Sequence, residues 1–405
     1  MQAIERNITL YRWSRFLRSL IFWQAMWFLY FQDVLSASEA ILLYAVYDVS
    51  TTILEVPSGY MSDKFGRRKT LIASAFAAFA GAVCLAVGNS FITFAIAQTL
   101  IGMGGAFASG TDEAMLYESL AASDRTDEIE AQEVVAWRYS FAALALSAIT
   151  GGAMALIDPR MPFVAGAIAM IGLIWVTFLM VEPPRTSPSA EGSELLRVTH
   201  LGDAFRNPVL LWFFALTVAM YGFSHLPFVF GQPFILEALD GAGFAASAPL
   251  VSGAVTALMM VISVVASLFA LKLRAALGLP MLLLGAFTLQ IAISGVMALT
   301  DSAIVLVFLL LRMVPDALSR PFILGQIQPL LPDDSRATWL SLKSFVGRLV
   351  FASALAAGAV STTNAGTFPY DDIAAILTVA VVIGVFVLTA LALTARVITQ
   401  NPKTP

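Results

Sequence analysis

The residues best able to do chemistry in this sequence are charged side chains that interrupt long apolar runs. An ionised side chain at the centre of a bilayer costs about 2.5–3.5 kcal/mol on insertion scales, so it normally faces a partner, a cavity or water. Asp112 and Glu113 are adjacent in one run, and Asp48 and Glu55 lie on one helical stripe of another. Adjacent carboxylates in a low dielectric bind protons more readily. These four residues are therefore the candidates for proton coupling.

Each of these carboxylates also has a purely structural interpretation. Asp112 and Glu113 could form a static charge pair with Arg138, and Glu55 could pair with a basic residue of the polar stretch that follows it. The two interpretations differ in whether the carboxylate changes its charge during function, and both remain open.

A third charged group lies near the carboxyl end of the chain. Arg312, Asp316 and Arg320 follow one another at intervals of four residues, and Pro315 and Pro321 interrupt the same apolar run. Proline removes a backbone hydrogen bond, which is tolerated at membrane depth only where protein or water satisfies the freed carbonyl. Arg312 and Asp316 either neutralise each other as a structural pair, or Arg312 faces a cavity and serves an anionic substrate or a coupling carboxylate.

Two apolar runs combine aromatic side chains with hydrogen-bonding groups. Gln24 and Trp27 lie in the first run, and Tyr221 and His225 lie in the seventh. Such a wall fits a bulky, partly apolar ligand, although aromatic side chains also gather at membrane interfaces.

Composition excludes several classes of protein. Hydrophobic residues make up 59% of the chain and charged residues 12%, whereas a soluble domain has about 25% charged residues. One cysteine and two histidines supply no disulfide framework and no Cys- or His-rich metal centre. There is no Gly-Lys-Ser or Gly-Lys-Thr phosphate loop for ATP. We therefore expect a non-enzymatic membrane protein with no catalytic residue, metal, other cofactor or nucleic-acid partner.

Twelve apolar segments predict an all-α membrane protein, because a helical span needs about 20 largely apolar residues. The segments cover residues 16–35, 38–60, 70–88, 91–118, 131–157, 161–181, 208–236, 245–270, 280–299, 303–330, 338–360 and 373–395. The first is expected to be a retained span and not a cleaved signal peptide.

The longest polar stretch, Glu182 to Asn207, separates six segments from six. We expect an amino-terminal six-helix half over 1–181, a linker over 182–207 with a short surface helix from Ser193 to Phe205, and a carboxyl-terminal half over 208–405. Duplicated halves with a site between them are a recurrent carrier architecture.

The distribution of cations predicts the orientation of these segments. Lys and Arg concentrate at the amino end, in the even-numbered loops and in the tail, whereas the odd-numbered loops hold only Arg160. Short cytoplasmic loops retain positive charge. Both termini and the linker should therefore be cytoplasmic.

One polar stretch carries a specific motif. The residues EVPSGYMSDKFGRRKT (55–70) end an apolar run at Pro57 and form what we expect to be a compact polar turn. Asp63 and Arg67, four residues apart, can pair on one helical face. The motif consists of Gly59, Asp63, Gly66, Arg67 and Arg68.

This order resembles, without a gap, the helix 2–helix 3 loop signature of the major facilitator superfamily, Gly-x-x-x-Asp-x-x-Gly-Arg-[Arg/Lys]. The resemblance implies the major facilitator fold, with twelve transmembrane helices in two pseudo-symmetric six-helix halves. In that family the loop is a conformational latch on the cytoplasmic side. Glu118 falls where the family has an acidic residue that pairs with the latch arginine, here Arg67.

The resemblance also implies where substrate binds, because segments 1, 4, 7 and 10 line the central cavity of that family. It places a cavity at six residues, Gln24, Trp27, Tyr221, His225, Arg312 and Asp316. The stretch from Glu55 to Gly59 resembles a variant common among drug and metabolite carriers. However, Gln98 stands four residues before Gly102, where that branch usually has arginine, and residues 131–157 contain no proline.

We therefore expect a monomeric secondary transporter in the inner membrane, whose partners are a small-molecule substrate, protons and the lipid bilayer. The favoured activity is export of a drug-like or metabolite molecule by proton antiport. The alternatives are proton-coupled uptake of a sugar, organic anion or metal chelate, and a membrane sensor or scaffold that transports nothing.

Overall fold

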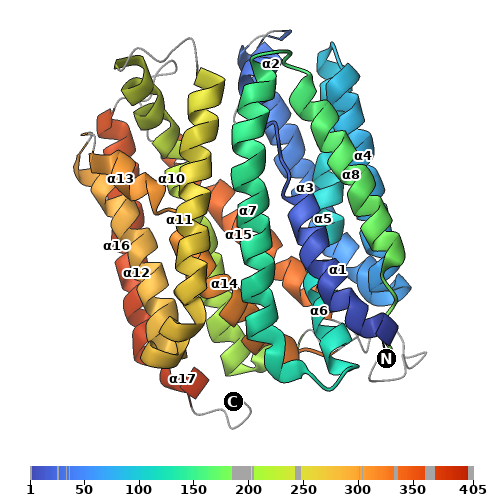
Figure 1. Ribbon diagram of the computed structural model, residues 1–405. Coiled ribbons are helices and arrows are strands. Elements are labelled where there is room, and N and C mark those ends of the chain that lie inside the picture. The colour runs from blue at the N-terminus through green and yellow to red at the C-terminus, as the bar shows by residue number, and fades with distance from the viewer. Residues whose placement is uncertain are drawn as a thin grey trace. The chain divides into compact units, whose positions relative to one another are not determined.

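The computed structural model describes residues 2–24, 27–32, 34–35, 37–184, 202, 205–241, 248–300, 302, 304–332, 336–360 and 370–399. The regular elements of this part of the chain are all helices (Figure 1). Two compact units can be distinguished. Unit 1 comprises Met1–Asp203, Ser247–Val261 and Gln328–Leu342, and unit 2 comprises Ala204–Ala246, Ile262–Ile327 and Lys343–Pro405. The division into halves at the linker stays a prediction, and residues 185–201 of that linker lie outside the described residues.

Among its described residues, unit 1 contains eight α-helices and the beginnings of two more. The eight are α1 (Gln2–Arg18), α2 (Trp27–Gln32), α3 (Ala37–Phe65), α4 (Arg67–Val87), α5 (Phe91–Ala108), α6 (Thr111–Ala121), α7 (Ile129–Ala155) and α8 (Met161–Leu179). The helices α11 (Ala248–Leu277) and α15 (Arg336–Val360) begin in unit 1 and continue in unit 2.

Unit 2 is built mainly from α10 (Pro208–Gly241), α12 (Leu279–Leu299), α13 (Ile304–Leu310), α14 (Val314–Ile327), α16 (Tyr370–Thr394) and α17 (Arg396–Thr399). Its described interior joins α10 to α12 and α16. Phe223 and Phe287 meet edge to face with ring centroids 5.5 Å apart, and the Trp212 indole donates to the Leu391 carbonyl at 3.1 Å.

The polar turn expected after Gly59 is wrong. Helix α3 continues through Pro57 to Phe65, and Gly66 alone separates it from α4. Proline removes one backbone donor but does not end a helix whose neighbours satisfy the freed groups. The Ser58 hydroxyl next to Pro57 lies 2.8 Å from the Ala106 carbonyl oxygen, a contact that holds this part of α3 against α5. Gly66 makes the turn with φ 107°, in the positive range that favours glycine.

Three expected continuous spans are interrupted. The first begins at Gln2, not at residue 16, and α1 ends at Arg18. The fourth breaks at Ser109 and Gly110, where Gly110 has φ 70°. The tenth breaks at residues 311–313, between α13 and α14. Arg18 thus sits at a helix carboxyl end and Asp112 in a first turn, the positions that a helix dipole favours for each charge.

The outer surface is suited to lipid. Among the described residues, eight helices are long and apolar enough to cross a membrane. Large apolar side chains on them are exposed, including Ile92 at 70%, Trp175 at 68% and Phe386 at 78%. Exposure on this scale is unfavourable in water but not in hydrocarbon, so these helices fit a bilayer.

Close packing of α7 generates a stability prediction. A Cβ added to Gly151 would overlap the carbonyl oxygen of Phe22, which is backbone and cannot rotate away. We expect Gly151→Ala to lower stability by about 1–3 kcal/mol, the usual cost of overpacking. Gly285→Ala in α12 is the matched control, because an added Cβ there meets nothing within 4 Å. Thermal unfolding in detergent should show a lower midpoint for Gly151→Ala alone, and equal midpoints would contradict the packing.

Candidate functional site

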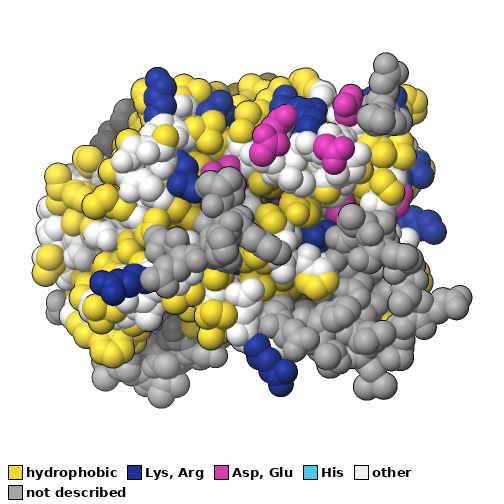
Figure 2. Space-filling model, turned by 90° about the horizontal axis from the view of Figure 1, so that it is seen from below, with side chains coloured by type: hydrophobic (Ala, Val, Ile, Leu, Met, Phe, Trp, Pro, Cys, Tyr) yellow, Lys and Arg dark blue, Asp and Glu magenta, His cyan; other side chains and the backbone are white. Residues whose placement is uncertain are grey.

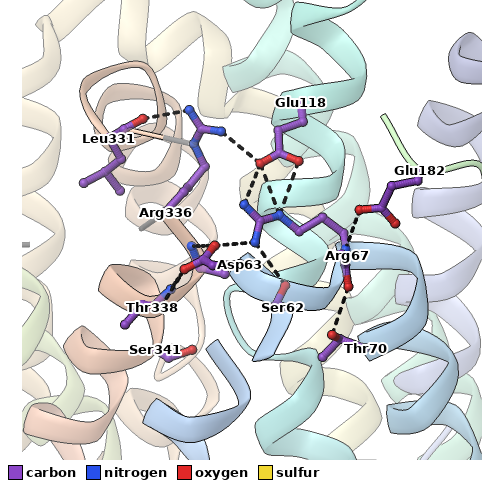
Figure 3. Close-up of polar contacts among 12 residues, drawn as sticks. Ser62, Asp63, Arg67, Thr70, Glu118, Glu182, Leu331, Arg336, Thr338 and Ser341 are labelled. Atoms are coloured by element: carbon purple, nitrogen blue, oxygen red, sulfur yellow. Dashed lines mark hydrogen bonds and ion pairs between the residues drawn. The ribbon is translucent and has the colours of Figure 1, made fainter. Parts of the chain in front are cut away.

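Arg67, the first residue of α4, is the centre of a buried charge network (Figure 3). Its side chain is buried, with only 1% of the residue exposed. The Nε and Nη2 atoms donate to Glu118 Oε1 at 3.1 and 2.7 Å. The Nη1 atom donates to the Ser62 hydroxyl at 3.2 Å and to the Asp63 carboxylate. The ion pair between Arg67 and Glu118 is therefore present, as the resemblance implies.

Asp63 binds the amino terminus of α15. Its carboxylate accepts hydrogen bonds from the backbone N–H groups of Ala337 at 3.1 Å and Thr338 at 2.8 Å. The Thr338 hydroxyl donates to it as well, at 2.5 Å. The first N–H groups of a helix have no partner within the helix and carry a partial positive charge. A carboxylate held by Arg67 thus caps a helix that starts 274 residues further along the chain.

Arg336, the first residue of α15, completes the network. Its Nη1 atom donates to Glu118 Oε1 at 3.0 Å, and its Nη2 atom donates to the Leu331 carbonyl at 2.7 Å. The guanidinium carbon lies 4.5 Å from the centroid of the Tyr117 ring, in a cation–π contact. Two arginines and two carboxylates therefore balance their charges inside the protein.

Two glycines allow the backbone of α15 to approach this closely. A Cβ added at Gly59 would lie 2.8 Å from the Ala337 carbonyl oxygen, and one added at Gly110 would lie 2.9 Å from the same atom. Any larger residue would push α15 away from Asp63. Gly59 of the motif therefore has a steric role, because it leaves room for the backbone of α15.

Glu182 holds the other side of the junction between α3 and α4. Its two carboxylate oxygens accept from the backbone N–H groups of Arg67 at 2.6 Å and Arg68 at 2.8 Å. The Arg68 side chain donates to the Phe178 carbonyl at 2.9 Å. Glu182 thus caps α4. Sequence reasoning missed this role, as it did that of Arg336, because neither partner follows from local spacing.

Asp112 belongs to a second buried cluster. Its Oδ2 atom lies 3.2 Å from Arg15 Nη1 and 3.0 Å from Arg18 Nη1, both on α1. For Asp112, the alternative of a static pair with Arg138 is therefore not realised, since its ion-pair partners are Arg15 and Arg18. The reason is that α1 begins far earlier than its apolar residues suggest, and its last turn brings two arginines to the first turn of α6.

The other proposed coupling residues differ in environment. Glu55 is buried, and the Ser109 hydroxyl donates to its Oε1 atom at 2.6 Å. The backbone N–H of Glu113 donates to Asp112 Oδ1 at 2.9 Å, and the Glu113 residue is half-buried. Asp48 is exposed on α3. Their role in proton coupling stays a prediction.

The residues expected to line a substrate cavity fall into both units, and their common cavity stays a prediction. In unit 1, Gln24 donates to the Leu144 carbonyl at 3.0 Å, and Trp27 meets Tyr44 with ring centroids 4.1 Å apart. In unit 2, the Tyr221 and His225 rings stack at 4.1 Å. The region around Trp27 is an apolar cluster that includes Phe31.

The alternative in which Arg312 and Asp316 form a structural pair is not realised. Asp316 Oδ2 instead lies 3.3 Å from Arg320 Nη2, one turn along α14. The helix is broken at residues 311–313, so Arg312 is not in helical register with Asp316. Among the described residues, no group of three or more His, Cys, Asp or Glu is placed to hold a metal ion.

The helical fold, the apolar exterior and the buried charge network around Arg67 are features of a multi-pass membrane protein with a major facilitator architecture. The sequence matches the family model of the Major Facilitator Superfamily over residues 10–357. The chain therefore belongs to this superfamily, and it is a secondary transporter of that type.

Solved structures with the same fold include transporters of different substrates. A bacterial homologue of the iron transporter ferroportin, in an outward-facing state, has a TM-score of 0.69 and 16% identity, covering 97% of this chain and 100% of that one. The human organic anion transporter MFSD10 (TETRAN) has a TM-score of 0.73 and 13% identity, covering 95% and 99%. The E. coli fucose:proton symporter FucP has a TM-score of 0.65 and 15% identity, covering 95% and 99%. No match was found among curated proteins. These identities establish the fold alone.

The capping of α15 by Asp63 generates a local prediction. Asp63→Asn removes the charge that two backbone N–H groups share, and hydrogen bonds to a charged group contribute about 1.5–3 kcal/mol each. We expect faster amide hydrogen exchange in residues 336–342 of this variant. Arg67→Ala should act more strongly, at about 3–5 kcal/mol, because it removes the cation shared by two buried carboxylates.

Lys69→Ala is the control for both variants. Lys69 is a cation of the same turn, but it is exposed, so its removal should leave exchange in residues 336–342 unchanged. Equal exchange in Asp63→Asn and Lys69→Ala would show that the cap does not hold the first turn of α15.

Proposed function

We propose that this transporter exports a small, partly apolar or amphiphilic solute by proton antiport, through alternating access. The observation that carries the proposal is the buried network of Asp63, Arg67, Glu118 and Arg336 at the start of α15. Alternating access needs contacts that hold one conformation and are absent from another. This network is such a contact, because it joins elements far apart in the sequence through charges.

The energetics of the network suit reversible opening. A buried ion pair gains attraction but loses hydration, so its net contribution to stability is close to zero. When such a network opens, water hydrates the separated charges and replaces much of the lost attraction. An apolar contact of the same area would instead expose hydrocarbon to water. Charges therefore favour a latch that closes and opens without a large change in free energy.

The latch is assigned to the cytoplasmic side, so that its closure corresponds to an outward-facing state. Lys and Arg residues gather in the even-numbered loops, including Arg67, Arg68 and Lys69, and short cytoplasmic loops retain such charges. The end of the molecule seen in Figure 2 carries Lys, Arg, Asp and Glu side chains among hydrophobic ones. Placing charged side chains at a membrane surface avoids the cost of burying them in lipid.

Two features support the choice of substrate and driving force. Asp112 is a buried carboxylate beside two arginines, and charge pairs of this kind change partners when a proton binds or leaves. Trp27, Tyr221 and His225 supply aromatic surface for a partly apolar solute. In this proposal, Asp112 and Glu113, with Asp48 and Glu55, couple proton entry to export, either by binding the proton or by exchanging an ion-pair partner with the carboxyl group that binds it.

The function is tested by a substrate screen in inverted membrane vesicles. Proton antiport predicts that an acidic lumen drives substrate into the vesicle, and that collapse of the pH gradient stops accumulation. Vesicles without the protein are the control. Accumulation only in right-side-out vesicles with an acidic exterior would instead indicate proton-coupled uptake. The absence of transport for every compound class tested in both orientations would favour a sensor or scaffold.

The orientation is tested separately with single cysteines in a Cys84→Ser background. A cysteine replacing Ser189 in the linker should resist a membrane-impermeant thiol reagent in intact cells and react once the cells are opened. A cysteine replacing Asp158, an exposed residue between α7 and α8, is the matched control and should react in intact cells. The reverse labelling pattern would invert the proposed topology.

A further inference from the structure

A carboxyl group outside the latch and outside the expected coupling set is buried in unit 1. Glu133, near the start of α7, is 0% exposed. Ile129 and Ala136, four residues before and three after it, lie on the same helical face. Both belong to an apolar cluster in which α7 packs with α1 and α6. Glu133 therefore projects from the side of α7 that packs against protein.

The partner of Glu133 is a tyrosine hydroxyl. Tyr11 Oη lies 3.2 Å from Glu133 Oε1 and 3.3 Å from Oε2, and Tyr11 is itself 1% exposed. Among the described residues, no Lys or Arg nitrogen lies within ion-pair distance of Glu133, whereas Asp63, Glu118 and Asp112 each contact an arginine. An ionised carboxylate here would have one donor for two oxygens. A neutral carboxyl group can accept from Tyr11 with one oxygen and donate back with the other.

The charged groups around Glu133 are committed to other partners or carry the same sign. On α1, Arg12 donates to Gln132 Oε1 at 2.5 Å, and Arg15 binds Asp112. On α6, Asp112 and Glu113 are within electrostatic range and oppose a further negative charge. On α7 itself, the Trp137 ring lies 4.8 Å from the Arg15 guanidinium, one turn beyond Glu133. Arg15 is thus the cation that can reach Glu133 from Asp112.

We propose that Glu133 is the residue at which unit 1 binds the coupled proton, and that Arg15 is exchanged between Asp112 and Glu133. In the conformation described, the carboxyl group of Glu133 carries the proton and Arg15 binds Asp112. When the proton leaves to water, Glu133 becomes a carboxylate and takes Arg15, while Arg18 stays on Asp112 Oδ2. No other group changes its charge. The assignment of this proton to transport rests on the proposed function.

The protonation state is tested without any substrate, so a failed transport assay leaves this test intact. Infrared spectra of the purified full chain, recorded over a pH titration, separate the carbonyl stretch of a protonated carboxyl group from carboxylate bands. We expect such a band at neutral pH in the wild type and its loss in Glu133→Gln. Glu130→Gln, the same change one turn away on α7 at a half-buried position, is the matched control and should keep the band.

Two further variants keep the proposal falsifiable if Glu133→Gln folds poorly. Tyr11→Phe removes the hydrogen bond to the carboxyl group and should raise the frequency of its carbonyl stretch. Arg15→Gln removes the cation that would take up the carboxylate, so the band should persist to more alkaline pH. A band that survives in Glu133→Gln, or a frequency unchanged in Tyr11→Phe, would overturn the assignment. A titration unchanged in Arg15→Gln would overturn the exchange.

Discussion

The burial of the Arg67 guanidinium is the constraint on which the rest of unit 1 depends. Removing a cation of this size from water costs several kcal/mol even after relaxation, unless its donors are all engaged. The side chain meets this demand with Ser62, Asp63 and Glu118, from the end of α3 and from α6. These three contacts fix where α3 ends, how α4 leaves it, and where α6 lies beside both.

The same requirement for hydrogen-bond partners extends to α15, because the carboxylates that bind Arg67 can accept further hydrogen bonds. Asp63 uses them on the N–H groups of Ala337 and Thr338, and Glu118 uses one on Arg336. Each member therefore completes its neighbour's hydrogen bonding, and none can move alone without stranding a buried charge. A network of this kind separates as a unit. That behaviour is what a contact between two conformational states requires, and a set of independent surface ion pairs would not provide it.

Local spacing predicts only the parts of this site that are local. Asp63 and Arg67 are one turn apart, so their pairing follows from helical geometry, and the long spans follow from apolar length. The contact from Arg336 to Glu118 spans 218 residues, and the contact from Glu182 to Arg67 spans 115. No helical periodicity in the sequence predicts either of these two contacts. The breaks at Gly110 and at residues 311–313 were missed because apolar composition continues across them. The partners of Asp112 were missed because the first half of α1 is too polar to be recognised as part of a span, although Ile8 and Tyr11 bury its apolar side against α6 and α7.

The two buried charge clusters of unit 1 differ in one respect that bears on their roles. In the network around Arg67, each carboxylate has an arginine, so the charges of the network balance. In the cluster of α1, α6 and α7, two arginines share one oxygen of Asp112 while Glu133 has a tyrosine hydroxyl. An even division of the cations would be the stable arrangement if both acids were permanently ionised, because opposite charges in a low dielectric attract strongly. The uneven division fits the proposal that Glu133 is neutral in this conformation. A complete network can respond to a change elsewhere only by separating, whereas an unevenly divided one can respond to a single proton by moving one side chain. The cluster of Asp112 and Glu133 is therefore better suited to binding or releasing a proton. The network around Arg67 is better suited to stabilising the conformation that results.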